Sequence, residues 1–278
     1  MASTAFQTLY RQEFIGTFEQ RQSLLRSAVT TMANVNGNSA IFLVAGSGGA
    51  SAVTRGVNGL IPARSDDLTQ NTATLAEWHD LVQRTGFNVE SSQGDARRIM
   101  QMTTMAVVNR KIDEDIIAQL DTATNDTGTT ATASLAMVAK SLAILGNAEV
   151  PIEDENNMFG LISPAFHAYL MQVESFTSAD YVEVKPFEGP VRRFRRWYGV
   201  NWIVHPNVSG VGTSTEKCYI FHRDAIGHAV NKDIRSAVGY DEEQDYSYAR
   251  CSVYMGSKLL QNGGVVQMKH DGSAYVAA

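Results

Sequence analysis

Residues 95–122 read DARRIMQMTTMAVVNRKIDEDIIAQLDT and contain neither glycine nor proline, whereas small polar residues and glycine interrupt the rest of the chain every few positions. Apolar residues recur in this stretch at steps of three and four, which places them on one face of a helix: Met102, Met105, Val108, Ile112, Ile116 and Leu120. A helix over 95–122, with Asp95 as N-cap, would be about 42 Å long, far beyond the average helix. One long rod among short strands favours an assembly subunit over an enzyme.

Composition sets the class of protein. A chain of 278 residues with 44% hydrophobic and 19% charged residues predicts an ordered protein with a substantial core. No apolar run approaches the roughly 18 residues of a membrane helix, and no secretory signal is expected. The net charge of −6 argues against a protein whose main surface neutralises DNA phosphates. Cys218 and Cys251 are expected to be buried free thiols rather than a disulfide.

Two of the segments before the long helix, residues 1–38 and the glycine-rich stretch, can each be interpreted in two ways. Residues 1–38 predict a helix with a narrow apolar face, which packs on its own domain or on another subunit. Residues 40–45 (AIFLVA) predict a strand. The glycine-rich stretch that follows, to residue 75, can bury little apolar surface. It is therefore either disordered or a long two-stranded excursion ordered by contacts outside its own core.

After the long helix, the pattern predicts alternating helices and strands without an internal repeat or a clear linker. Short strand and helix signals also mix at 72–92, before it. Ser163-Pro164 is typical of a helix start, with the proline in the first turn. The expected helices are 133–147, 163–173 and 224–230, and the expected strands are 157–162, several within 181–208, 217–222, 246–251 and 263–271.

Motifs for chemistry are weak throughout. The glycines at 46–49 lack the spacing of a dinucleotide fingerprint or a phosphate-binding loop. His222-Arg223-Asp224 matches three letters of a kinase catalytic loop without its partners. The histidines are scattered, and the acidic clusters lack calcium-loop spacing. The sequence therefore predicts no catalytic residues, no cofactor-binding residues, no cofactor and no metal site.

Residues 190–198 (PVRRFRRWY) form the strongest charged feature, with arginines interleaved among aromatic residues. This pattern is compatible with nucleic-acid binding by charge and stacking. It equally suits a protein interface, where arginine and aromatic residues are enriched. In a chain of net charge −6 the interface is the favoured interpretation. The candidate contact residues are Arg192, Arg193, Arg195 and Arg196.

Taken in order, several segments resemble the major capsid protein of tailed double-stranded DNA bacteriophages. The matching segments span nearly the whole chain: YRQEFIGTFEQRQSLLRSAV (10–29), TRGVNGLIPARSDD (54–67), VNRKIDEDIIAQL (108–120), RRFRRWYGVNWIVHPNV (192–208), CYIFHRDAIGHAV (218–230) and MGSKLLQNGGVVQMKHD (255–271). The resemblance implies an α+β chain with the HK97-type capsid fold. It implies an N-arm at 1–38, an E-loop region at 39–78, a peripheral domain at 79–125 with spine helix 95–122, an axial domain at 126–239, and strands at 240–278 that return to the peripheral domain.

The resemblance also implies a function. The chain would assemble with itself, as hexamers and pentamers, into an icosahedral shell around phage DNA, in the host bacterial cytoplasm. Its implied partners are a portal, a separate scaffolding protein, possible decoration proteins and non-specifically bound packaged DNA, with no membrane. The first lysine is Lys111, so the loop lacks the lysine that some relatives use for an isopeptide bond. Arg55 and Arg64 would make salt bridges there, and we expect a non-covalent shell. An encapsulin-like compartment shell and an uncharacterised enzyme are the alternatives.

Overall fold

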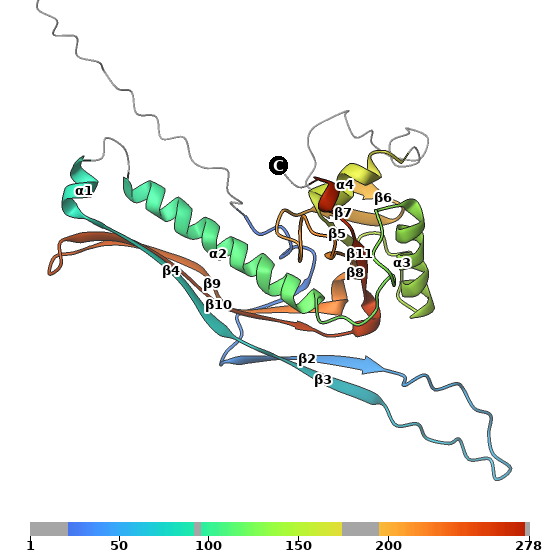
Figure 1. Cartoon of the computed structure of the whole chain (residues 1–278). Helices are drawn as coiled ribbons and strands as arrows, with labels where there is room; N and C mark the ends of the chain where they lie inside the picture. The colour runs from blue at the N-terminus through green and yellow to red at the C-terminus, as the bar shows by residue number, and fades with distance from the viewer. Residues whose placement is uncertain (1–21, 92–95, 174–194, 276–278) are drawn as a thin grey trace, which may run out of the picture. The chain divides into compact units, whose positions relative to one another are not determined.

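The computed structural model describes residues 22–91, 96–173 and 195–275 (Figure 1). The chain divides into two compact units. The first comprises Met1–Ser23, Glu77–Lys111 and Asp233–Val253, and the second comprises Leu24–Ala76, Ile112–Lys232 and Tyr254–Ala278. Three elements, α2, β9 and β10, run from one unit into the other. Helices and sheets are both prominent, as expected for an α+β chain.

The elements follow one another in mixed order. The strands are β1 Thr30–Ala33, β2 Ser39–Gly46, β3 Asp67–Thr74, β4 Ala76–Thr85, β5 Met158–Ile162, β6 Arg195–Trp197, β7 Val200–Val204, β8 Glu216–His222, β9 Ile226–Asp241, β10 Tyr246–Leu259 and β11 Val265–His270. The helices are α1 Gly86–Ser91, α2 Ala96–Leu120, α3 Leu135–Asn147 and α4 Pro164–Leu170, with 3₁₀ turns at Arg223–Ala225, Asn262–Gly264 and Ser273–Tyr275.

A five-stranded sheet forms the centre of the second unit, with strand order β11-β8-β5-β7-β6. Strand β5 is parallel to β7 and antiparallel to β8. Every residue of β5 (MFGLI) is buried, as a central strand covered on both faces requires. Gly160 is needed there because a Cβ would lie 2.6 Å from Cε3 of Trp202. The sheet therefore depends on close packing of the Trp202 indole across β5.

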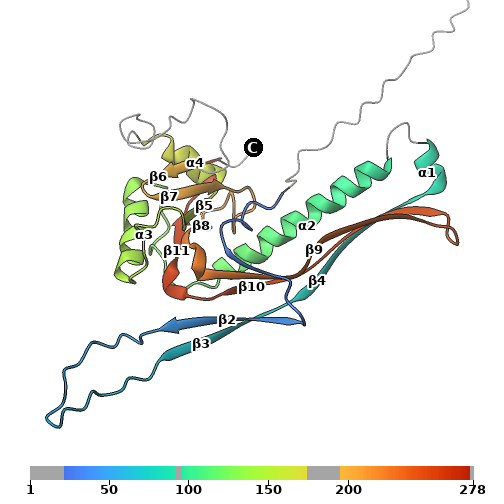
Figure 2. The ribbon, with the colours of Figure 1, turned by 180° about the vertical axis from the view of Figure 1, so that it is seen from behind.

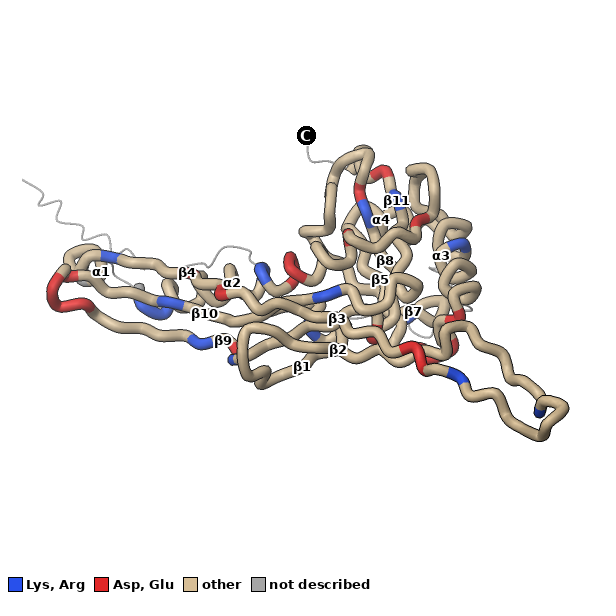
Figure 3. The backbone as a smooth tube through the Cα atoms, turned by 90° about the horizontal axis from the view of Figure 1, so that it is seen from below, with Lys and Arg blue, Asp and Glu red and all other residues tan. Residues whose placement is uncertain are grey.

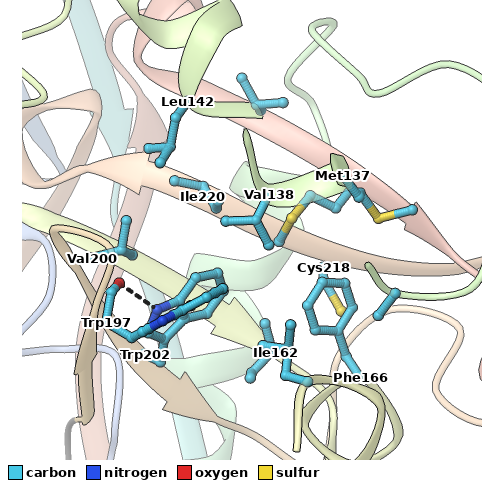
Figure 4. Close-up of a cluster of buried hydrophobic side chains, with 14 of the residues drawn as sticks. Met137, Val138, Leu142, Ile162, Phe166, Trp197, Val200, Trp202, Cys218 and Ile220 are labelled. Atoms are coloured by element: carbon cyan, nitrogen blue, oxygen red, sulfur yellow. Dashed lines mark hydrogen bonds between the residues drawn. The ribbon is translucent and has the colours of Figure 1, made fainter. Parts of the chain in front are cut away.

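Helices α3 and α4 complete this core. Figure 4 shows side chains of α3 and α4 meeting those of β5, β7 and β8, and the Trp202 indole N–H donates to the Trp197 carbonyl at 3.0 Å. Ser134 and Ser163 cap the two helices. The side chain of each serine accepts a hydrogen bond from the backbone N–H three residues further along the chain. The predicted start at Ser163-Pro164 is confirmed, although α4 ends at Leu170 rather than at 173.

The second sheet has the order β1-β9-β10-β4, with β1 parallel to β9. It corrects two predictions. The helix expected at 224–230 is wrong, because a single 3₁₀ turn leads directly into β9. Ile226–Val230 is buried at every position, so this short apolar run carried no period that could separate helix from strand. The helix expected across 22–38 is also wrong, since a turn and β1 occupy it, and residues 1–21 lie outside the described part.

The long helix is present as α2, within the predicted bounds of 95–122. Its expected start, Asp95, lies outside the described residues. Val108, Ile112, Ile116 and Leu120 are buried as predicted, but Met102 and Met105 are exposed. The buried line instead continues through Met100 and Thr104 at steps of four. Thr104 can enter it because its hydroxyl donates to the Met100 carbonyl at 3.0 Å, so it leaves no unpaired buried donor.

Two neighbouring acidic residues of α2 have different surroundings. Glu114 is exposed, whereas one carboxylate oxygen of Asp115 is buried. The Lys111 ammonium lies 4.4 Å from the centroid of the Trp78 ring, a cation–π contact within the first unit. In the same unit the Gln101 amide donates to Ser236 on β9 at 3.0 Å.

Strands β2 and β3 form a separate two-stranded antiparallel sheet, running from the pair Ser39 and Thr74 to the pair Gly46 and Asp67 (Figure 2). Of the two alternatives for this glycine-rich region, the structure has the two-stranded excursion. Its base is packed, because Ala40, Phe42 and Ala73 form a small buried cluster with Ala229 of β9. The 20 residues between the paired ends, 47–66, continue as a loop outside this cluster.

The C-terminal strands are divided between two sheets. β10 belongs to the sheet with β9 and β4, but β11 pairs antiparallel with β8 in the five-stranded sheet. Val265, Val266 and Met268 of β11 are fully buried there. The chain therefore closes the core of the second unit with its last strand.

Candidate assembly surfaces

The loop 47–66, here called the hairpin loop, exposes four aliphatic side chains to solvent. The relative exposure is 106% for Val57 and 73% for Leu60, and it is above one half for Val53 and Ile61. The tip is closed by its own backbone, with Gly59 N donating to Gly56 O at 2.9 Å and Gly56 N to Leu60 O at 3.0 Å. The loop thus has a defined turn and no apolar contacts that would cover its side chains.

Charge is sparse on the hairpin loop. Figure 3 shows mostly uncharged positions between β2 and β3, and the only basic residues are Arg55 and Arg64. Arg64 joins the two sides of the loop, because its guanidinium donates to Ser47 O at 3.2 Å and to the Asp66 carboxylate at 3.4 Å. Within the described residues Arg55 makes neither a hydrogen bond nor an ion pair. The structure therefore engages Arg64 within the chain and leaves the charge of Arg55 available.

The arginine cluster is only partly visible in the described structure. Arg192 and Arg193 lie outside the described residues, and Arg195 is known only as a backbone position in β6. Arg196 donates to Glu155 at 3.0 Å and to Asn156 at 3.0 Å within its own chain. Trp197 is buried in the core, so it cannot stack on nucleic-acid bases. Intramolecular pairing therefore accounts for one of the four candidate contact arginines.

Two carboxylates hold α2 and the residue directly after it to distant segments, and neither was identified from the sequence. The Asp121 carboxylate accepts hydrogen bonds from Ser209, from Lys217 at 3.0 Å and from Tyr219 at 2.6 Å. Burial raises the pKa of Asp121, but the three hydrogen bonds and the Lys217 charge outweigh it and hold the pKa below its usual value. The second carboxylate, that of Asp113, is fully buried.

Potential metal-ligating and nucleophilic side chains are scattered over the described residues. No three metal-ligating side chains converge in the described ranges. Cys218 and Cys251 are free and buried, as predicted, and burial raises the pKa of both thiols. His222 accepts a hydrogen bond from Asp224 N at 3.2 Å, which gives it a local role in the turn before β9. No described helix combines the length and apolar character that crossing a bilayer requires.

Comparison with known proteins decides the family. Residues 2–272 match the phage capsid protein family. The chain belongs to that family. No curated protein matches the sequence.

Solved phage structures share the fold of this capsid protein at low identity. A structure of Mycobacterium phage Che8 aligns at a TM-score of 0.75 and 14% identity, covering 96% of this chain and 98% of that one. The capsid of Ralstonia phage GP4 aligns at 0.70 and 11%, covering 100% of both. The capsid of cyanophage P-SCSP1u aligns at 0.69 and 14%, covering 96% and 93%. The predicted HK97-type fold and a shell-forming capsid protein are confirmed.

Proposed function

We propose that this capsid protein builds a closed icosahedral shell of hexamers and pentamers around phage double-stranded DNA, with the hairpin loop as its main contact with a neighbouring copy. The observation that carries the proposal is the exposure of Val53, Val57, Leu60 and Ile61 on a loop with no apolar cover of its own. Monomeric proteins rarely display such a run unless a partner covers it. A shell supplies a partner copy at every position.

The energetics suit a repeated interface. Burying one such aliphatic side chain contributes about 1.5–3 kcal/mol, before the cost of ordering the loop is subtracted. A single contact can therefore stay weak enough to dissociate and correct assembly errors. Repetition over the shell then supplies the overall stability, because each added subunit engages several neighbours at once.

Charge on the hairpin loop supports the same role. Arg55 lies beside Val53 and Val57 and has no partner among the described residues. A guanidinium at an interface favours carboxylates, which it can bind with two parallel hydrogen bonds. We therefore propose that Arg55 pairs with an acidic residue of the neighbouring copy. Arg64, already bonded to Ser47 and Asp66, would hold the loop in shape, and Arg192, Arg193 and Arg195 remain contact candidates.

The shell is proposed to be non-covalent. An amide cross-link from the hairpin loop needs a lysine amine, and the chain has no lysine before Lys111. Particles boiled in detergent should therefore run as single chains of about 30.3 kDa on a denaturing gel. A ladder of covalent multimers would overturn this part of the proposal.

The remaining assignments follow from the family. We propose a spine-helix role for α2, an N-arm role for 1–38, a peripheral-domain role for 79–125 and an axial-domain role for 126–239. Assembly in the bacterial cytoplasm with a portal and a separate scaffolding protein fits the same proposal. Decoration proteins would bind the outer face, and packaged DNA would meet the inner face without sequence preference.

A paired substitution tests the hairpin contact. Val57→Asp with Leu60→Asp places two charges at the tip, and the matched control Val57→Ile with Leu60→Met keeps the tip apolar. We expect the charged variant to remain folded by circular dichroism and to form no shells by sedimentation and electron microscopy, while the control assembles. Normal shells from the charged variant would refute the contact. Particles filled with protein instead of DNA would favour a compartment shell over a phage capsid.

A further inference from the structure

Asp113, in the middle of α2, has a carboxylate with no exposure to solvent. Two consecutive backbone amides point at it: Leu24 N donates to Oδ2 at 3.0 Å, and Leu25 N donates to Oδ1 at 3.1 Å. These residues stand 89 and 88 positions earlier in the chain. A buried carboxylate is costly unless donors satisfy it, so this pairing constrains where residues 24–25 can lie.

A third donor comes from the segment after β7. His205 Nε2 lies 3.2 Å from Asp113 Oδ2, and both side chains are fully buried. The other ring nitrogen, Nδ1, accepts a hydrogen bond from Asn207 N at 3.1 Å. Because Nδ1 acts as an acceptor it carries no proton, which assigns the proton to Nε2 as the donor to Asp113. The backbone of His205 is itself fixed, with its N–H on the Ile162 carbonyl at 2.9 Å.

We propose that Asp113 is a positioning residue that fixes the backbone path of residues 24–25. Its carboxylate joins three segments that are distant in sequence: residues 24–25, α2 and the turn after β7. Hydrogen bonds of residues further along the chain fix other positions of this segment: Arg223 donates to Ser27 O at 2.7 Å, and Thr30 donates to Asp224 at 2.7 Å. Those contacts do not set the path of the two residues before Arg26.

The two hydrogen bonds to Asp113 fix the backbone direction of residues 24–25, whereas an apolar contact alone would only hold these residues near α2. Leu25 is fully buried, and its side chain alone would tolerate several backbone directions. Two successive amides on the two oxygens of one carboxylate allow only one direction. Any other path takes two backbone donors away from a buried carboxylate, which is penalised more heavily than a lost apolar contact. The path of residues 24–25 is therefore encoded in α2.

Hydrogen exchange of the unassembled full-length chain tests the proposal, so the result does not depend on shell formation. In Asp113→Asn an amide group replaces one accepting oxygen and faces a backbone N–H. We expect the peptide covering residues 22–30 to exchange about ten- to a hundredfold faster, the range for losing a charge-assisted hydrogen bond. Peptides of β8 and β11 should keep their protection. Glu114→Gln removes the same charge from the next position of α2 and should match the wild type.

A pair of histidine variants keeps the proposal testable if Asp113→Asn does not fold. In His205→Gln the amide nitrogen takes the place of Nε2 and can still donate to Asp113. In His205→Asn the amide oxygen takes the place of Nδ1, so Asn207 keeps its acceptor but Asp113 loses a donor. We expect faster exchange at residues 22–30 in the asparagine variant only. Equal protection in both variants, or unchanged protection in Asp113→Asn, would overturn the positioning role.

Discussion

The five-stranded sheet and the β2–β3 hairpin belong to the same compact unit and are stabilised in opposite ways. The sheet buries Trp202, Tyr219 and Phe221 almost completely, whereas the hairpin loop exposes Val57 and Leu60. A hydrophobic core provides the free energy of folding, and an uncovered apolar loop contributes none until a partner arrives. The comparison teaches that burial in the sheet stabilises the fold of this chain, whereas the exposed apolar residues of the hairpin loop are free for the contact proposed above.

The largest expected effect comes from the core of the sheet. Trp202→Ala should lower the free energy of unfolding by about 3–5 kcal/mol, because it removes the indole that packs across Gly160 and leaves a cavity. Urea titration of the unassembled chain measures it. Tyr198→Ala, at an exposed neighbouring position, serves as the control and should change it by less than about 1 kcal/mol. A small effect of Trp202→Ala would remove the distinction between the two regions.

The contrast between a buried core and an exposed hairpin also explains which elements could be predicted from the sequence. Elements of the core carried strong local signals: the apolar run of β5 and the Ser163-Pro164 start of α4. The start of β9 did not, because a short apolar segment buried on both faces has no period of its own. The face of α2 was misjudged at Met102 and Met105, since a buried threonine, Thr104, took a position that periodicity reserves for apolar residues.

A buried histidine gives the next largest expected effect. Burial lowers the pKa of His228 to about 4, partly offset by Asp115, and its ordinary value is 6.5. In the unfolded chain this imidazole binds a proton as the pH falls below 6.5, while the folded chain resists until about 4. The group therefore destabilises the fold progressively over that window, by up to about 3 kcal/mol at its acid end.

His228→Asn isolates this contribution, because the amide can keep the contact of Nδ1 with Ser257 Oγ, which is 2.9 Å long in the wild type. Urea titrations at pH 7 and pH 4.5 should show a smaller loss of stability on acidification in the variant than in the wild type. An identical loss in both proteins would show that His228 is protonated without penalty in the fold.

Removing one ion pair from the core and one from the hairpin should change the free energy of unfolding by less than the substitutions above. Asp121→Asn removes the negative charge and one of the two oxygens that accept hydrogen bonds from Ser209, Lys217 and Tyr219, and should cost about 1–3 kcal/mol. The pKa of Asp121 is lowered in the fold, so its stabilisation is present above pH 3.8 and is lost as the pH falls through the folded pKa. The difference between variant and wild type in urea titrations should therefore narrow under acid.

The matched change in the hairpin is Asp66→Asn, which removes the partner of Arg64. Both side chains of this pair are largely exposed, and exposed pairs contribute little to folding. We expect the free energy of unfolding to stay within about 0.5 kcal/mol of the wild type. A cost as large as that of Asp121→Asn would mean that the hairpin shares in the folding of its unit.

The candidate contacts show the limit of sequence reasoning about sites. The exposed charge of Arg55 was predictable, since a glycine-rich loop with few apolar residues offers nothing to bury it. The pairing of Arg196 with Glu155 was not, because the two residues are 41 positions apart and only the edge of the sheet brings them together. Asp113 and Asp121 were missed for the same reason: their donors come from segments about 90 residues away.

The smallest expected effect on folding is at the hairpin itself. Leu43→Ala truncates a β2 side chain that is 72% exposed, so the unassembled chain should unfold within about 0.5 kcal/mol of the wild type. The matched core change, Leu161→Ala on β5, should cost about 2–5 kcal/mol, because that leucine is fully buried. Shells built from Leu43→Ala should nevertheless dissociate at lower urea than wild-type shells, since the contact is repeated around the particle. If the two leucines cost the same in the unassembled chain, the hairpin is part of the folding core and the division between a folding region and an assembling region fails.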